Sequence, residues 1–432
     1  MSTLNVDKVD PNTGTALEIG SSGDTVTVPS GATLTLTSAT LNLPTTITST
    51  TEVKTNKISP ATGVAFALGD SGDTFTVPSG ATIVNSGTAT GFGITASSFR
   101  PNVNPLVYNG DMAIAQRGTS TTSNGALIDR WKVYDSTDGV ITYTTSTESP
   151  EEEGFNNSLK VACSTADTSI AAAQYAQINY FIEGQDCQLF KYGTSSAETI
   201  TLAFWIRSKQ TGTFCTNIIK KPGSGTRYEI VNEFTVSVAD TWEKKIITIS
   251  PTAGSTSFIT SAAGAIVDSN ADGFDFSISL AVGTDYHTTD DTWVAASDKM
   301  STSSQTNFMS STSNEIYITG VQLEVGEYTS ATLPPFQHET YAENLFRCQR
   351  YYRTWGGGHL YEQFTVGYNT GATSASTVLN YSVPQMRTVP TQSVSAAGDW
   401  KIYSVASSYT CTEVSYGNPT NSDRQLMMTT GG

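Results

Sequence analysis

The sequence predicts an all-β protein in which N-terminal β repeats precede a jelly-roll β-sandwich, one linking helix and a small C-terminal β domain. Three observations predict this class. Charged residues make up only 14% of the 432 residues, against about 25% in typical domains, and Ser, Thr, Gly and Asn take their place. Short segments with strand periodicity recur between polar turns. A single segment has the spacing of a helix.

Residues 1–100 contain an internal repeat with a period of 49 residues. From Lys8 to Thr33, 17 of 26 positions are identical to Lys57 through Thr82. Each copy predicts a strand, a turn and a strand, because its Pro and Gly residues suit turns. A unit with so few apolar residues needs neighbours to bury a core. We therefore expect an intertwined homotrimer in which symmetry mates cover the repeats; a string of small separate modules is the alternative.

Residues 101–337 predict the jelly-roll β-sandwich. A domain boundary is expected near residue 100, where Gly, Ser and Pro residues interrupt the pattern. Beyond it, aromatic-rich strands recur every 10–25 residues with polar loops between them, which is typical of sandwiches and jelly rolls. The clearest strands span residues 199–207, 242–249, 274–281 and 315–325.

Residues 338–432 predict a linking helix and a C-terminal β domain at the distal tip. Thr340 and Glu343 have the spacing of a capping box, in which hydroxyl and carboxylate satisfy free backbone N–H groups. Glycines 356–358 must end the helix, and residues 359–432 return to strands and turns. The residues spaced as one helical face are Tyr341, Leu345, Cys348 and Tyr352.

The acidic balance limits the classes of partner. A net charge of −16 and a pI near 4.5 argue against nucleic-acid binding, because phosphate would be repelled. The two basic pairs, Lys220-Lys221 and Lys244-Lys245, are interpreted as solvated strand ends. Five scattered cysteines indicate reduced, buried thiols and not a disulfide framework or a zinc site. We expect no signal peptide and no membrane insertion.

Several motifs recur in a specific order, and together they indicate a family. In chain order they are the segments 109–119 (NGDMAIAQRGT), 129–131 (DRW), 204–208 (FWIRS), 241–249 (TWEKKIITI), 320–326 (GVQLEVG) and 341–352 (YAENLFRCQRYY). This series resembles a jelly-roll domain widespread in phage tail fibre proteins, which is similar to carbohydrate-binding modules. The N-terminal repeats resemble stretches in marine cyanophage structural proteins.

The resemblance implies a structural virion protein of a tailed phage, expected to be a homotrimeric tail fibre that recognises a host-surface glycan during adsorption. It implies attachment to other virion tail proteins through the N-terminus, assembly in the host cytoplasm and a final location in the virion. Two alternatives stay open. One is another virion appendage, such as a head fibre, collar or knob component; the other is a glycan-degrading tailspike.

Glycan binding needs flat aromatic faces beside polar groups. Trp131, Trp205 and Trp242 are expected in the core. The ligand-binding candidates lie in a polar loop and around the glycine run after the helix: Trp293, Tyr351, Tyr352, Trp355, His359 and Tyr361. Packing in the core or at a trimer interface is the alternative for these aromatics.

Metal binding and catalysis receive little support from the sequence. Asp268, Asn270 and Asp272 precede a glycine with the spacing of half a calcium loop, so a structural calcium is one interpretation and a plain polar turn the other. No nucleophile, metal-ligand or phosphate-loop motif appears. We therefore expect no enzymatic activity and no cofactor besides that calcium, although carboxylate pairs for glycan hydrolysis are spatial and stay open.

Overall fold

The computed structural model describes Thr25, Thr27 and residues 105–221, 226–355, 365–380, 384–404, 407–419 and 423–430. The chain divides into two compact units, Met1–Thr88 and Ala89–Gly432. The predicted 49-residue repeats lie outside the described residues, apart from Thr25 and Thr27. The three sheets of the described structure lie in the second unit.

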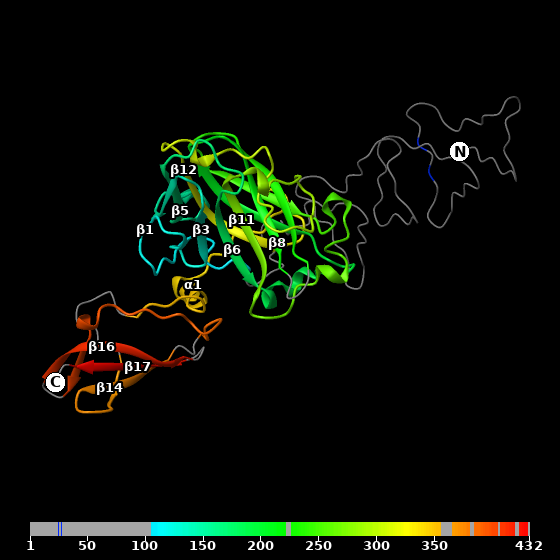
Figure 1. Cartoon of the computed structure of the whole chain (residues 1–432). Helices are drawn as coiled ribbons and strands as arrows, with labels where there is room; N and C mark the ends of the chain where they lie inside the picture. The colour runs from blue at the N-terminus through cyan, green and yellow to red at the C-terminus, as the bar shows by residue number, and fades with distance from the viewer. Residues whose placement is uncertain are drawn as a thin grey trace, which may run out of the picture. The chain divides into compact units, whose positions relative to one another are not determined.

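Two six-stranded antiparallel sheets form a β-sandwich, which confirms the predicted all-β class (Figure 1). The first sheet has the strand order β1-β4-β5-β12-β7-β10 and the second the order β2-β3-β6-β11-β8-β9. The first sheet consists of β1 (Ser120–Thr121), β4 (Val140–Ser146), β5 (Ser158–Thr165), β7 (Ile200–Ser208), β10 (Glu243–Ile249) and β12 (Glu315–Val325). The second consists of β2 (Gly125–Ala126), β3 (Trp131–Asp135), β6 (Tyr175–Glu183), β8 (Gly212–Lys220), β9 (Tyr228–Val236) and β11 (Asp272–Val282).

Short 3-10 helices occupy the loops of the sandwich. Their bounds are η2 (Glu151–Glu153), η3 (Gly184–Phe190), η4 (Ala253–Ser255), η5 (Ala262–Gly264), η6 (Thr284–Tyr286) and η7 (Phe308–Ser310). The acidic residues Glu151–Glu153 form the exposed η2. The four predicted strands correspond to β7, β10, β11 and β12, and the bounds of β12 agree with the prediction.

Alternation along the strands builds the core between the sheets. The ring of Phe204 in β7 lies 5.3 Å from that of Phe234 in β9, so the two sheets meet at this point. Each such buried side chain contributes roughly 1.5–3 kcal/mol. Trp205 and Trp242, predicted to be core residues, are only half-buried, because Trp205 points to the outer face of β7. The inward residues of β7 are Ile200, Leu202, Phe204 and Ile206.

The start of the sandwich is held against its last strand. The Asn109 amide donates to the carbonyls of Ile114 and Asp129, both at 2.9 Å. Gly110 accepts a backbone hydrogen bond from Val321 of β12 at 3.0 Å, and a Cβ on Gly110 would overlap the Val321 carbonyl oxygen. The opening and closing motifs are therefore in direct contact. Trp131 is buried, as predicted.

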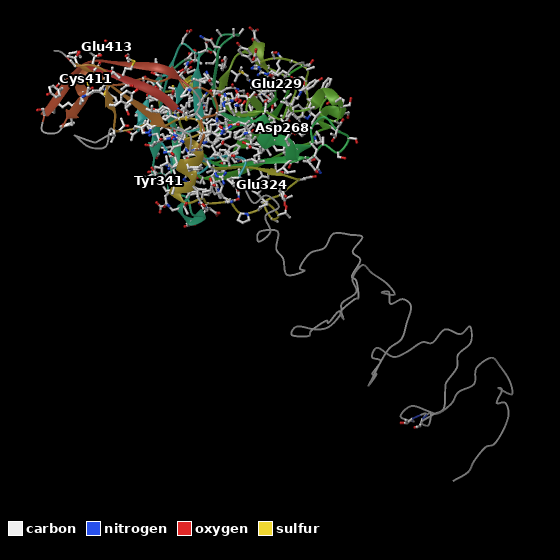
Figure 2. All side chains as sticks on the ribbon, turned by 90° about the horizontal axis from the view of Figure 1, so that it is seen from below. Glu229, Asp268, Glu324, Tyr341, Cys411 and Glu413 are labelled. Carbon is white, nitrogen blue, oxygen red and sulfur yellow. The ribbon has the colours of Figure 1, made fainter. Side chains whose placement is uncertain are left out.

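The segment 283–306 covers the outer face of the second sheet over β8, β9 and β11. Ser279 donates its hydroxyl to the Met300 carbonyl at 2.6 Å, and Asn217 donates to the carbonyl of Lys299. The Glu229 carboxylate, marked in Figure 2, accepts from the backbone N–H groups of Asp298 and Lys299. These polar side chains are buried but hydrogen-bonded, so their burial is compensated.

The prediction that Lys220 lies at a solvated strand end is wrong. Lys220 is 2% exposed rather than solvated. Its ammonium donates to the Ala263 carbonyl at 2.8 Å and lies 5.4 Å from the Tyr228 ring. Burial lowers the pKa of Lys220. The lysine lies at the end of β8 where η5 packs over it, a tertiary contact that a basic pair in the sequence does not reveal.

The linking helix α1 (Tyr341–Cys348) is present with the predicted capping box between Thr340 and Glu343. It ends before residue 352, and its predicted apolar face is only partly correct. Tyr341 is 65% exposed, whereas Asn344 and Cys348 are buried. Asn344 donates to Asp111 at 3.0 Å, so a hydrogen bond to the opening segment orients this short helix.

A separate five-stranded sheet follows the helix, as predicted for the C-terminal β domain, with the order β13-β14-β17-β16-β15. Its elements are β13 (Tyr368–Asn369), β14 (Ser374–Asn380), η8 (Ala397–Asp399), β15 (Lys401–Ser404), β16 (Ser407–Pro419) and β17 (Asp423–Thr430). All five cysteines are buried free thiols, as predicted. Within the described ranges, no helix has the length and apolarity to cross a membrane.

Candidate functional site

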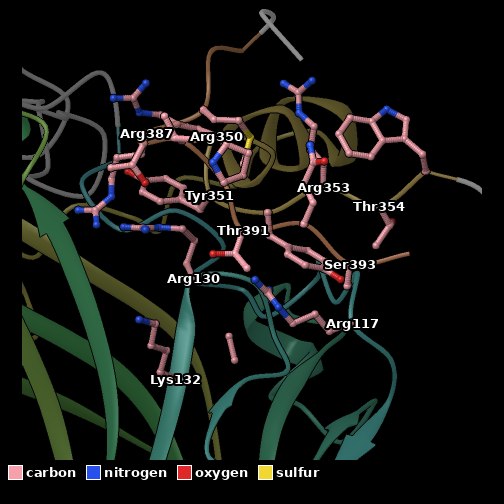
Figure 3. Close-up of a pocket in the computed structure, with 18 of the residues that line it drawn as sticks. Arg117, Arg130, Lys132, Arg350, Tyr351, Arg353, Thr354, Arg387, Thr391 and Ser393 are labelled. Carbon is pink, nitrogen blue, oxygen red and sulfur yellow. The ribbon is translucent and has the colours of Figure 1, made fainter. Parts of the chain in front are cut away.

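A pocket of about 870 Å³ lies beside the β2-β3-β6 side of the second sheet. One wall comes from the sandwich and includes Arg117, Arg130 and Lys132. The other comes from the segment 350–355 after α1 and the segment 386–395 before η8. Figure 3 shows Arg350, Arg353 and Arg387 approaching from this second wall, opposite the three cations of the sandwich.

The structure brings three of the predicted ligand-binding aromatics together. Tyr351, Tyr352 and Trp355 all line the pocket, and Trp355 is 42% exposed. His359 and Tyr361 lie outside the described residues. Trp293 lies elsewhere and is buried, which agrees with the alternative of core packing and not with a ligand-binding role.

Trp293 packs into the core of the sandwich. It is 1% exposed, its indole N–H donates to the Ser250 carbonyl at 2.8 Å, and its ring meets Tyr192 edge-on at 6.3 Å. No face of this ring is available to a ligand. The polar residues Asp290 and Asp291 before Trp293 suggested an exposed loop, but that loop folds back over the sheet.

The two tyrosines do not offer bare rings either. The Arg130 guanidinium lies 3.4 Å from the centre of the Tyr351 ring, and that of Arg117 lies 3.5 Å from the centre of the Tyr352 ring. These are close cation–π contacts. The Tyr351 hydroxyl donates to Glu183 at 2.6 Å. Both tyrosines therefore position arginines at the pocket wall, whereas Trp355 is the aromatic candidate for contact with a ligand.

Three of the lining arginines are held by carboxylates. Arg350 makes a bidentate pair with Glu183 through Nε and a terminal nitrogen, at 2.7 and 2.8 Å. Burial raises the pKa of Glu183, but hydrogen bonds from Arg350 and Tyr351 outweigh burial, so the net pKa is lowered. Arg117 pairs with the buried Asp129 at 2.6 Å. The third pair, between Arg387 and Asp272, also measures 2.6 Å.

The other three lining cations form no ion pair with any residue that the structure describes. Arg130 donates to the Phe181 carbonyl, and its buried Nε has no hydrogen-bond partner. Arg353 donates to the carbonyls of Gln349 and Pro384 at 3.2 and 2.6 Å. The Lys132 ammonium lies 4.8 Å from the centre of the Phe181 ring. Burial lowers the pKa of both Lys132 and Arg353.

Two of the three predicted calcium residues contact Arg387. Asp272 pairs with Arg387, and Asn270 donates its amide to the Arg387 carbonyl at 2.7 Å. Asp268 (Figure 2) is exposed. Among the described residues, no group of three or more His, Cys, Asp or Glu side chains is arranged to hold a metal.

The basic character of the pocket was missed by the sequence prediction, which considered only the lysine pairs at 220–221 and 244–245. Neither pair lines the pocket. The residues that do are dispersed from 117 to 387, so the sequence shows no basic run. The one local signal is the segment 350–355 (RYYRTW), in which two arginines flank the predicted tyrosines.

Comparisons with known proteins do not assign the chain to a family. No family model matches, and no curated protein matches. Among solved structures, the enzymatically active domain of bacteriophage CBA120 tailspike protein 4 is 14% identical with a TM-score of 0.28, covering 51% of this chain and 21% of that chain.

Two further structures are similar over about half of the chain. A sugar-binding protein from Bacteroides thetaiotaomicron is 14% identical with a TM-score of 0.28, covering 51% of this chain and 100% of its own. The family 11 carbohydrate-binding module of a Clostridium thermocellum cellulase is 11% identical with a TM-score of 0.25, covering 49% of this chain and 97% of that chain. At such TM-scores these likenesses carry no functional argument. The structure itself defines the class: an all-β sandwich protein with a basic, aromatic pocket.

Proposed function

We propose that this chain is a non-catalytic, saccharide-binding virion protein that serves as a tail fibre and contacts a glycan on the host surface. The pocket carries the binding part of the proposal. Its volume of about 870 Å³ lies in the range of small-molecule sites, roughly 300–1,000 Å³. Trp355 supplies an apolar ring, and Thr354, Thr391 and Ser393 supply hydroxyls beside it. This combination suits a sugar, which has an apolar ring face and a polar rim.

The lining supports binding and not hydrolysis. Cleavage of a glycosidic bond uses two carboxyl groups on either side of the bond. Among the described lining residues, Asp272 is the single carboxylate, and its side chain is paired with Arg387. The described lining therefore lacks the second carboxyl group that this reaction uses.

The tail-fibre part of the proposal is supported by the ordered motifs of residues 109–352 and by the N-terminal repeats. In this proposal the repeats attach the protein to other tail proteins, and three chains assemble through them. Three pockets on one fibre would add their affinities by avidity, so a weak single site could hold the particle. Light scattering on the full chain should give three times the chain mass; the mass of one chain would contradict the trimer.

Substitution of Trp355 by Ala tests the saccharide site. On an array of bacterial surface glycans, the full chain should bind at least one class, and Trp355→Ala should lower that affinity about tenfold, which is ~1.4 kcal/mol. Trp242→Ala is the matched control, because Trp242 is half-buried beside Tyr317 on the first sheet, away from the pocket. The control should leave binding unchanged.

Two results would contradict the proposal. The first is an equal loss of binding in both variants at unchanged melting temperature. The second is release of oligosaccharides from host polysaccharide by the purified protein, which would make it a glycan-degrading tailspike.

A further inference from the structure

The pocket has an excess of positive charge that its own carboxylates do not neutralise. Its described lining includes six cationic side chains and one carboxylate, Asp272. Asp129 and Glu183 lie behind the lining and pair with Arg117 and Arg350. Asp186 also acts on Arg130 and Arg350 from behind the lining. Three of the six cations, namely Arg130, Lys132 and Arg353, form no ion pair with a described residue. The chain as a whole has a net charge of −16, so the positive charge of the pocket contrasts with the negative charge of the protein.

The structure holds one of these three cations in place at a conformational cost. Arg130 has a φ of 77°, in the left-handed region, which is strained for a residue other than glycine. In this conformation its guanidinium lies between the Tyr351 ring at 3.4 Å and the Tyr180 ring at 4.9 Å. Both rings fix the cation at the pocket wall, and neither supplies a negative charge. A fixed cation that forms no ion pair of its own is suited to an anion from outside.

Lys132 is the second unpaired cation. Its neighbour Trp131 points into the core, so Lys132 points from β3 into the pocket. Its side chain makes no hydrogen bond or ion pair within the part of the chain that is described. Burial has the largest effect on the pKa of Lys132 and lowers it. Asp272 raises this pKa, whereas Arg387, Arg130 and Arg117 lower it further. An anion in the pocket would relieve the repulsion among these cations.

Arg353 is the third, and it faces Lys132 and Arg130 from the opposite wall (Figure 3). Two of its nitrogens donate to the carbonyls of Gln349 and Pro384. A guanidinium has five N–H donors, so the backbone fixes the side chain and leaves donors for a ligand. Such a fork matches carboxylate, sulfate and phosphate groups.

We propose that the pocket binds an acidic saccharide, whose carboxylate, sulfate or phosphate group contacts Lys132, Arg130 or Arg353. This inference rests on the proposed function and specifies its ligand class. A saccharide is favoured over a nucleic acid, because the chain's net charge of −16 would repel a long phosphate backbone. A single acidic sugar places its charge inside the pocket.

The test uses the full chain and pairs of oligosaccharides that differ only in charge. One pair is a galacturonate oligomer and its fully methyl-esterified counterpart; a second is a sulfated galactan oligomer and its desulfated form; a third is a phosphorylated mannan oligomer and its dephosphorylated form. Affinities are measured by titration calorimetry, and a single-stranded oligonucleotide is included. At least one acidic member should bind ten or more times tighter than its neutral partner.

Lys132→Gln should reduce that preference at least fivefold without weakening the neutral member. Lys244→Gln is the matched control, because it removes the same charge from an exposed lysine beside Trp205 on the first sheet. An equal effect of both variants would overturn the proposal, since it would reflect net charge alone. The melting temperature of each variant verifies that it is folded.

The remaining outcomes separate the two levels of inference. Equal binding of acidic and neutral members would overturn the acidic ligand and leave the saccharide function standing. Binding of no saccharide from the pairs or the glycan array would overturn both. Tighter binding of the oligonucleotide than of every saccharide would replace the proposal with nucleic-acid recognition.

Discussion

Replacement of Arg350 by Met removes the ion pair that joins the segment after α1 to the sandwich. Glu183, at the end of β6, has a side chain that is 1% exposed, and Arg350 donates two hydrogen bonds to it. Met has a similar length and leaves the carboxylate in place. The variant therefore measures the free-energy cost of leaving the Glu183 carboxylate buried without its arginine. Tyr351 is then the remaining side-chain donor to Glu183 from the second wall.

The magnitude follows from the burial of the two partners. Breaking a fully buried ion pair costs about 3–5 kcal/mol, because one charge stays buried without compensation, whereas an exposed pair contributes about 0–1 kcal/mol. Glu183 is buried, but the Arg350 side chain is 26% exposed, so water can reach the site. We expect Arg350→Met to lower the free energy of unfolding by about 2–3 kcal/mol. Arg350→Lys should cost less, since it keeps the charge and loses the bidentate geometry.

Urea denaturation followed by tryptophan fluorescence measures this loss, and a double-mutant cycle with Glu183→Gln isolates the pair. The net pKa of Glu183 is lowered in the folded protein. Its contribution to stability is therefore full above its unfolded pKa, about 4.5, and is lost as the pH falls through the folded pKa. The difference between wild type and Arg350→Met should be largest near pH 7 and shrink below about pH 4. A coupling energy under about 0.5 kcal/mol, or a difference independent of pH, would refute the reasoning.

Two further predictions concern the sandwich. Burial raises the pKa of Asp275 to about 6, against the opposing effect of Lys221. Ionisation of Asp275 should therefore destabilise the fold by roughly 2–3 kcal/mol as the pH rises from about 4 to 6. Asp275→Asn should flatten this part of the stability–pH curve, and an unchanged slope would contradict the assignment. Gly110→Ala should lower the stability by about 1–3 kcal/mol, because the new methyl group would overlap the Val321 carbonyl oxygen; thermal melts beside a Gly398→Ala control, where no atom lies within 4 Å of the added Cβ, measure the effect of crowding, and equal losses would count against it.

Features set by neighbouring residues were predictable from the sequence. Strand periodicity located β7, β10, β11 and β12, because alternation along a strand decides which side chains reach the core. The capping box of α1 was predictable because Thr340 and Glu343 satisfy backbone groups within one turn. Burial of Trp131 followed from its place in the opening motif.

Features made by distant segments were not predictable in this way. Lys220 is buried because η5 supplies a carbonyl 43 residues further along the chain. Trp293 is buried because its loop folds back over the sheet. The pocket combines residues from 117 to 400, so its charge emerges only when the sandwich and the segments after α1 are placed together. Of the predicted site, the segment 351–355 was found because its aromatics are adjacent in sequence.

The covered outer face of the second sheet has a consequence for the shape of any ligand. The segment 283–306 lies over β8, β9 and β11 and makes hydrogen bonds to their polar side chains, so this part of the sheet offers no open trough along which an extended polymer could lie. The pocket beside β3 and β6 is compact instead. Under the proposed function, the protein would therefore recognise a chain end or a side branch, and lengthening an oligosaccharide beyond about two or three units would add little affinity.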